Sequence, residues 1–113
     1  MTLAEELNEL LPAKWVRTTP HTNYAWLDIT PTSGFAISVC QKTDGTYTVT
    51  THTETGSATS NPVPRERLVS SVTHFTANVC VFARLVNYKM TVPVWAQEKF
   101  EKQYAPFDMD QVQ

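Results

Sequence analysis

The chain has 113 residues, of which 42% are hydrophobic and 18% are charged, a balance typical of one folded domain and not of a disordered or fibrous chain. Its formal net charge is −2, which gives no general attraction to phosphate backbones and argues against strong nucleic-acid binding. We therefore expect a single α+β domain over residues 1–105, followed by a loose C-terminal tail at 106–113.

The composition also favours a cytoplasmic protein. The opening stretch "MTLAEELNELLPAK" is acidic and lacks the basic region of a secretory signal. The longest uninterrupted apolar run, "VCVFA", is far too short to cross a bilayer. Two cysteines are too few for the disulfide framework of a small secreted domain, so we expect Cys40 and Cys80 to be free thiols.

The first predicted element is a short amphipathic helix before Pro12. Its leucines recur at helical spacing, at positions 3, 7, 10 and 11. Thr2 precedes this run and Glu5 follows three residues later, which is the pattern of a capping box.

Four segments with strand character follow, at 14–19, 24–29, 35–41 and 46–53, separated by turn-forming residues. They predict an antiparallel meander. Alternation assigns one face to the core, made of Ala25, Leu27, Ile29, Phe35, Ile37, Val39, Tyr47 and Val49. The opposite face carries Tyr24, Trp26, Asp28, Ala36, Ser38, Cys40, Thr46, Thr48, Thr50 and His52. The threonine-rich segment 46–53 has two wettable faces, so we expect it at the edge of the sheet.

Residues 54–65 read as a polar loop, and a long helix is predicted at about 65–88. Its core stripe is Leu68, Val72, Phe75, Val79, Phe82 and Val86. A short final helix should begin at Pro93, with Ala96, Phe100 and Tyr104 on one stripe. The predicted fold is thus an N-terminal helix, a four-stranded meander, a long helix packed on one sheet face and a short last helix.

Two surfaces hold more apolar or aromatic material than the core requires. The back of the long helix continues with Val81, Leu85 and Tyr88. The second surface is the outer sheet face, where Tyr24 and Trp26, together with Trp15, would be ringed by Thr48 and Thr50. Both patterns are typical of a protein-binding surface, and the first suits a homodimer equally well. The alternative is that the C-terminal segment, with its own Trp95, folds back and covers them.

Catalytic and metal-binding patterns are sparse. Cys40 and His52 share the outer sheet face and form the one candidate for a cysteine nucleophile with its base, a reading that we rank third. Phosphate-binding glycine loops, paired metal-ligand motifs and a nucleophile elbow are missing from the sequence, so we expect a non-catalytic protein without metal or cofactor.

The order of helix, strands and helix resembles that of double-stranded RNA-binding domains, which implies an alternative role as a nucleic-acid-binding α-β-β-β-α module. The basic cluster that this family has at the start of its last helix is replaced here by "PRERLVSS". We therefore favour a small protein-binding module, such as an inhibitor or accessory protein of the kind that bacterial viruses make.

Overall fold

The computed structural model describes residues 2–17, 23–30, 34–88 and 90–107. The elements, in chain order, are α1 (Leu3–Leu10), β1 (Tyr24–Asp28), β2 (Ala36–Gln41), β3 (Tyr47–Thr53), β4 (Gly56–Thr59), η1 (Arg65–Arg67), α2 (Leu68–Leu85), η2 (Val94–Ala96), α3 (Gln97–Tyr104) and η3 (Ala105–Phe107). The predicted α+β architecture is confirmed. Because η1 runs directly into α2, the two form one helix of 21 residues, Arg65–Leu85.

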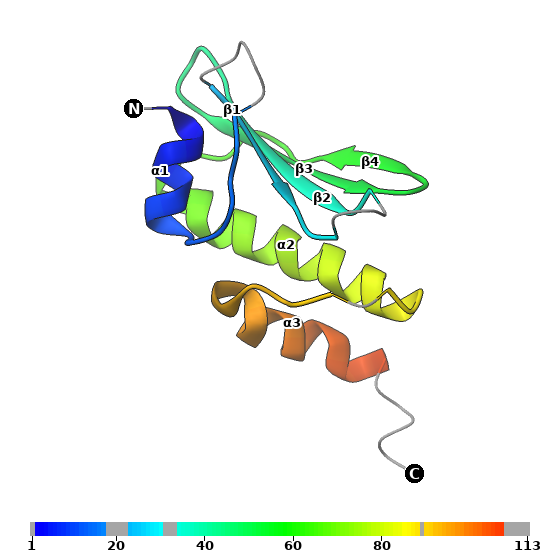
Figure 1. Cartoon of the computed structure of the whole chain (residues 1–113). Coiled ribbons are helices and arrows are strands. Elements are labelled where there is room, and N and C mark those ends of the chain that lie inside the picture. The colour runs from blue at the N-terminus through cyan, green and yellow to red at the C-terminus, as the bar shows by residue number, and fades with distance from the viewer. Residues whose placement is uncertain (1, 18–22, 31–33, 89, 108–113) are drawn as a thin grey trace.

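The strands form a single antiparallel sheet in the order β1-β2-β3-β4. Figure 1 shows α2 running beneath the sheet, α1 at one end beside it, and α3 on the side of α2 that faces away from the sheet. The molecule therefore has three layers, and α2 is the middle one.

The N-terminal helix begins as its sequence predicts. The Thr2 hydroxyl accepts a hydrogen bond from the Glu5 backbone N–H at 3.2 Å, and the Glu5 carboxylate accepts one from the Thr2 N–H at 3.0 Å. These hydrogen bonds lower the pKa of Glu5. The capping box fixes the first turn, so Leu3 and Leu7 face the core.

The predicted strand at 14–19 is wrong. Only Val16 pairs with the sheet, through an isolated bridge to Trp26, while residues 18 and 19 lie outside the described part of the chain. The reason is local: the side-chain amide of Asn8 donates to the Trp15 carbonyl and accepts from the Trp15 N–H, both at 3.1 Å. These bonds hold Trp15 along α1, so its backbone cannot join a strand ladder.

The fourth strand comes instead from the segment that the sequence predicted as a loop. Thr53 pairs with Gly56, and Ala58 pairs with Thr51, so β4 folds back on β3. The threonine-rich β3 is therefore an interior strand, and the prediction that it forms the edge is wrong. Four small or polar residues with exposed side chains can make a strand here because the backbone pairing needs no apolar burial.

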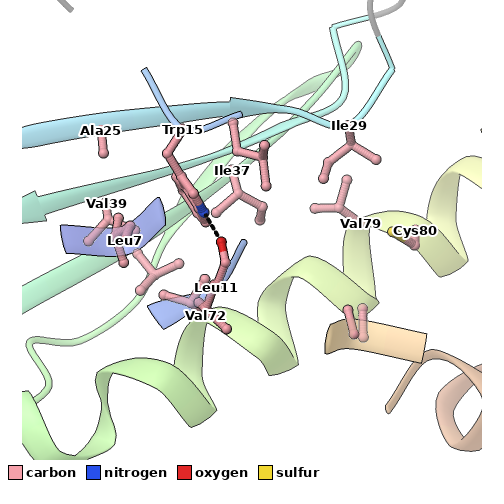
Figure 2. Packing of buried hydrophobic residues seen from close by; sticks show 14 of the residues in the cluster. Leu7, Leu11, Trp15, Ala25, Ile29, Ile37, Val39, Val72, Val79 and Cys80 are labelled. Atoms are coloured by element: carbon pink, nitrogen blue, oxygen red, sulfur yellow. Dashed lines mark hydrogen bonds between the residues drawn. The ribbon is translucent and has the colours of Figure 1, made fainter. Parts of the chain in front are cut away.

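The core lies between the inner sheet face and the two helices. All eight inner-face residues predicted from alternation are buried. In Figure 2, Leu7 and Leu11 approach Ile37 and Val39 of β2 from one side, and Val72 approaches from α2. The Trp15 indole lies among them and donates from Nε1 to the Leu11 carbonyl at 3.1 Å. A buried tryptophan with its one donor satisfied contributes a large apolar area to this core.

The long helix ends three residues before the predicted position. Asn87 adopts a left-handed conformation with φ 64°. The Asn87 N–H donates to the Arg84 carbonyl and the Tyr88 N–H to the Ala83 carbonyl, which is the hydrogen-bond pattern of a Schellman cap. The chain then turns Tyr88 back toward the sheet, where its ring meets Phe35 at 5.0 Å between centroids.

The core stripe of α2 also departs from the prediction. Leu68, Val72 and Val79 are buried, but Phe82 and Val86 are exposed. Thr76 and Ala83, which share a helical face with Val72 and Val79, are fully buried. The larger Phe75 and Phe82 lie at the flank of this face, where the Phe82 ring meets that of the buried Phe35 at 5.7 Å between centroids.

The last helix packs on α2 through the predicted stripe of Ala96, Phe100 and Tyr104. The Arg84 guanidinium lies 5.0 Å from the Phe100 ring centroid and 5.6 Å from that of Tyr104, which adds a cation–π contact between α2 and α3. Residues 106 and 107, which the prediction assigned to a loose tail, belong to η3, and the remaining residues of that predicted tail, 108–113, lie outside the described part.

Candidate protein-binding surfaces

The aromatic residues of the predicted outer-face surface divide between core and surface. Trp15 is only 3% exposed and belongs to the core, stacked near Trp95 at 6.4 Å between ring centroids. Trp95 in turn donates from Nε1 to the Pro12 carbonyl at 3.2 Å. These two tryptophans attach the C-terminal segment to α1, and this leaves Tyr24 and Trp26 as the aromatic residues of the outer face.

The centre of the outer sheet face is a compact polar and aromatic cluster. Trp26 of β1 and His52 of β3 meet across β2, with ring centroids 4.5 Å apart. Beneath them Ser38 is 2% exposed, and its Oγ lies 2.9 Å from His52 Nε2. Trp26 Nε1 donates to the Asp28 carboxylate at 2.7 Å. The Trp26 indole N–H, the Ser38 hydroxyl and His52 Nε2 each have a partner within this cluster, so the outer face is partly closed by its own side chains.

Burial also affects the chemistry of this cluster. It disfavours the charged imidazolium and lowers the pKa of His52. The threonines named in the sequence prediction, Thr48 and Thr50, lie half-buried on the same strand, and the Thr50 hydroxyl lies 2.8 Å from that of Thr59 on β4. They form part of a flat wettable surface and not a hollow.

The strand register argues against a pairing of Cys40 with His52. His52 is opposite Ala36, while Cys40 lies four residues further along β2, a separation of about 13 Å along the strand. The His52 ring nitrogen is instead bonded to Ser38. Cys80 is buried in the core, where burial raises the pKa of its thiol to about 12, and both cysteines are free. The geometry gives the cysteine-based alternative no support.

Within the described ranges, no cluster of three or more histidine, cysteine, aspartate or glutamate side chains could hold a metal ion. His21 lies outside these ranges. His74, on α2, approaches the Gln103 side-chain amide of α3 at 3.3 Å. Its position is accounted for by helix packing.

The end of α2 carries the largest group of exposed apolar side chains in the described residues. Phe82 is 38% exposed, Leu85 44% and Val86 40%, and Phe107 of η3 is 56% exposed. Phe82, Leu85 and Phe107, with the buried Val81, line a cavity of about 430 Å³ between α2 and the end of α3. We call this cavity and its exposed rim the α2–α3 hollow.

This hollow contains two of the predicted residues of the long helix and excludes the third. Val81 forms its floor and Leu85 its rim, whereas Tyr88 turns away and donates from its hydroxyl to the Glu54 carboxylate at 2.9 Å. That hydrogen bond raises the pKa of Tyr88. Sequence reasoning missed Phe82 and Phe107, because the helical stripe placed the first in the core and the second was assigned to the tail.

A second hollow lies on the other side of the α2 flank, under β4. It has a volume of about 320 Å³ and is lined by Thr51, Thr53 and Ala58 of the sheet and by Phe75, Asn78, Val79 and Phe82 of α2. We call it the β4 hollow. The hollow lies between β3 and β4 on one side and the flank of α2 on the other.

Length and composition alone would also allow Arg65–Leu85 to cross a bilayer. The core helix of a soluble protein passes the same test, and part of this helix is buried between the sheet and α3. The feature is therefore weak grounds for any membrane role.

Comparison with known proteins gives no relative. No known protein family matches the chain, and neither a curated protein nor a solved structure is significantly similar to it.

Proposed function

We propose that this chain is a small non-catalytic module that binds another protein through the α2–α3 hollow. The observation that carries the proposal is the exposure of Phe82, Leu85 and Phe107 around one cavity, even though α3 already packs on α2. A contiguous apolar patch of this kind on a small domain marks a site of association more often than chance.

The surroundings of the hollow support a protein partner. Its wall is polar at Asn78 and Gln103, which gives an apolar centre with hydrogen-bonding groups at the rim. Aromatic side chains such as Phe82 and Phe107 supply large contact area at low cost in conformational entropy. The proposal includes a cytoplasmic role as an inhibitor or accessory protein. Such a role requires no catalytic centre, and we identify none in the described residues.

The test is recovery of partners from the cell that makes the protein. We expect Leu85→Glu to lose the specific partner, because the partner would have to bury an unpaired carboxylate. Val94→Glu is the matched control, since Val94 is 82% exposed and lies in η2, which precedes α3, away from the hollow. Retention of the same partners by a folded Leu85→Glu variant would contradict the proposal.

A further inference from the structure

The β4 hollow lies beside the free edge of the sheet, and together they favour an extended peptide as a ligand. β4 pairs with β3 on one side, and no strand of the described residues pairs with its other side. The four residues of β4 are Gly56, Ser57, Ala58 and Thr59. Edge strands in proteins are commonly protected by a charged residue, a proline or a bulge, and β4 has neither a charge nor a proline.

The hydrogen-bonding groups that face outward can be assigned. The Ser60 N–H donates to the Val49 carbonyl at 2.8 Å, so Ser60 points toward β3. Pointing direction alternates along a strand, and Ala58 therefore also points toward β3, whereas Ser57 and Thr59 present their N–H and C=O groups to the open edge. These backbone groups are the attachment points for an extended peptide.

The side-chain direction adds a second requirement. Ala58 is opposite Thr51, so its side chain lies on the core face of the sheet, above the β4 hollow. A residue placed opposite Ala58 by a further strand would point its own side chain to that face. On the α2 side the hollow is walled by Phe75, Asn78, Val79 and Phe82, and the small side chain of Ala58 leaves its volume of about 320 Å³ open.

A second copy of the chain fits this edge poorly. Pairing β4 with β4 of another molecule would place only glycine and alanine over the hollow, and these are too small to fill it. The four-residue edge is also only about 13 Å long. Two copies joined there alone would bury far less than the ~1,200 Å² of a stable complex.

We propose that β4 accepts an extended segment of another protein as a fifth strand, with a large apolar side chain opposite Ala58 that enters the β4 hollow. Backbone hydrogen bonds to Ser57 and Thr59 hold the segment, and contact with Phe75 and Phe82 selects the apolar residue. The biological meaning of this site depends on the proposed binding role, but its test does not require the natural partner.

The probe is the peptide acetyl-Lys-Thr-Thr-Phe-Thr-Thr-Lys-amide, whose lysines suit a protein of net charge −2. We expect binding in the millimolar range, seen by NMR as saturable shifts of the Ser57 and Thr59 amides and of the Phe75 and Phe82 ring signals. The same peptide with alanine in place of phenylalanine should bind at least fivefold more weakly.

Ser57→Pro tests the backbone bonds. It removes one outward N–H while the inward bonds of Ala58 and Ser60 remain, and edge strands tolerate proline at such a position. We expect this variant to lose peptide binding at least fivefold and Ser57→Thr to keep it. Should Ser57→Pro fail to fold, the wild-type protein is tested with a peptide N-methylated on both sides of its phenylalanine, which should not bind.

Equal binding of the phenylalanine and alanine peptides, equal binding of the N-methylated peptide, or no shifts at Ser57 and Thr59 at about 10 mM peptide would each overturn the proposal. If the peptide fails while Leu85→Glu still removes the cellular partner, the edge site is rejected and the α2–α3 hollow stands. If the peptide binds while Leu85→Glu keeps its partners, the reverse holds.

Discussion

Thr76 is a buried polar residue without a partner. It is fully buried on α2, and its hydroxyl makes no hydrogen bond in the described structure. An unsatisfied buried hydroxyl costs about 1–3 kcal/mol, and valine has nearly the same shape without that group. We expect Thr76→Val to raise the free energy of unfolding by about 1 kcal/mol, measured by urea denaturation. Thr73→Val is the control, since Thr73 donates to the Val69 carbonyl and should not gain stability.

His52 should make the stability of the folded protein fall as the pH becomes mildly acidic. Burial lowers its pKa in the folded protein, so the unfolded chain binds the proton more readily. The stability contribution is therefore complete above the ordinary histidine pKa of about 6.5 and is lost as the pH falls toward the lower folded value. We expect the melting temperature to drop between pH 7 and pH 5.

His52→Phe is the matched variant for that measurement. It retains an aromatic ring against Trp26 and removes the titrating group, at a constant cost because Ser38 loses its partner. Its melting temperature should change less with pH than that of the wild-type protein. An identical pH dependence in the two proteins would mean that His52 is not the group responsible.

The two thiols should differ in reactivity. Cys80 is buried in the core, and burial holds its pKa at about 12, so the nucleophilic thiolate is absent at neutral pH. Cys40 is half-buried on the outer sheet face. We expect a thiol reagent such as DTNB to modify one equivalent in the folded protein and two after denaturation. Rapid modification of two equivalents without denaturant would show that the core opens near Cys80.

At the scale of the element, the end of α2 depends on one backbone conformation. Asn87 has φ 64°, where glycine is unstrained and other residues with a Cβ pay a steric cost. We expect Asn87→Gly to keep the stability of the wild-type protein and Asn87→Ala to lower it by about 1 kcal/mol. Thermal denaturation of the three proteins measures this. Equal stability of the alanine and wild-type proteins would mean that the Schellman cap contributes little.

Elements with a strong side-chain pattern could be predicted from the sequence. The leucine spacing and capping box gave α1, and alternation gave the inner faces of β1, β2 and β3, because each pattern follows from the geometry of a single element. The Asn8 side chain that holds the Trp15 backbone away from a strand ladder, and the backbone pairing that makes β4, are tertiary effects. Neither leaves a periodic signal, since β4 buries no side chain.

The α2–α3 hollow was only partly predictable for the same reason. The apolar back of the long helix identified Val81 and Leu85, but no pattern along the chain shows that the helix stops at Leu85 or that Asn87 redirects Tyr88. Phe82 lies at the flank of the buried face of α2, partly exposed, while its ring still meets that of Phe35. Which of the apolar residues of this helix are buried is settled only once the sheet and the helix are packed together.

At the scale of the whole molecule, charge bears on the alternative role as a nucleic-acid binder. With a net charge of −2, the protein has no overall attraction to phosphates, and α1 presents Glu5 and Glu6 in its first turn. We expect weak association with double-stranded RNA at low salt and none at physiological salt, where screening removes residual contacts. Fluorescence anisotropy across a salt series checks this, and tight binding that resists salt would favour the alternative.

The α2–α3 hollow also allows a symmetric dimer, which is a different use of the surface from binding another protein. In a two-fold contact Phe107 of one copy would enter the hollow of the other, and the reverse contact would form at the same time. We expect sedimentation equilibrium to show self-association in the high micromolar range, lost in Leu85→Glu and retained in Val94→Glu. At about 1 mM, even a contact with a binding free energy of about 4 kcal/mol is half-formed. A wild-type protein that stays monomeric up to this concentration would leave the hollow free for a different partner. Leu85 would then be exposed in every free molecule, and a different protein, not a second copy, would remain the proposed occupant of the hollow.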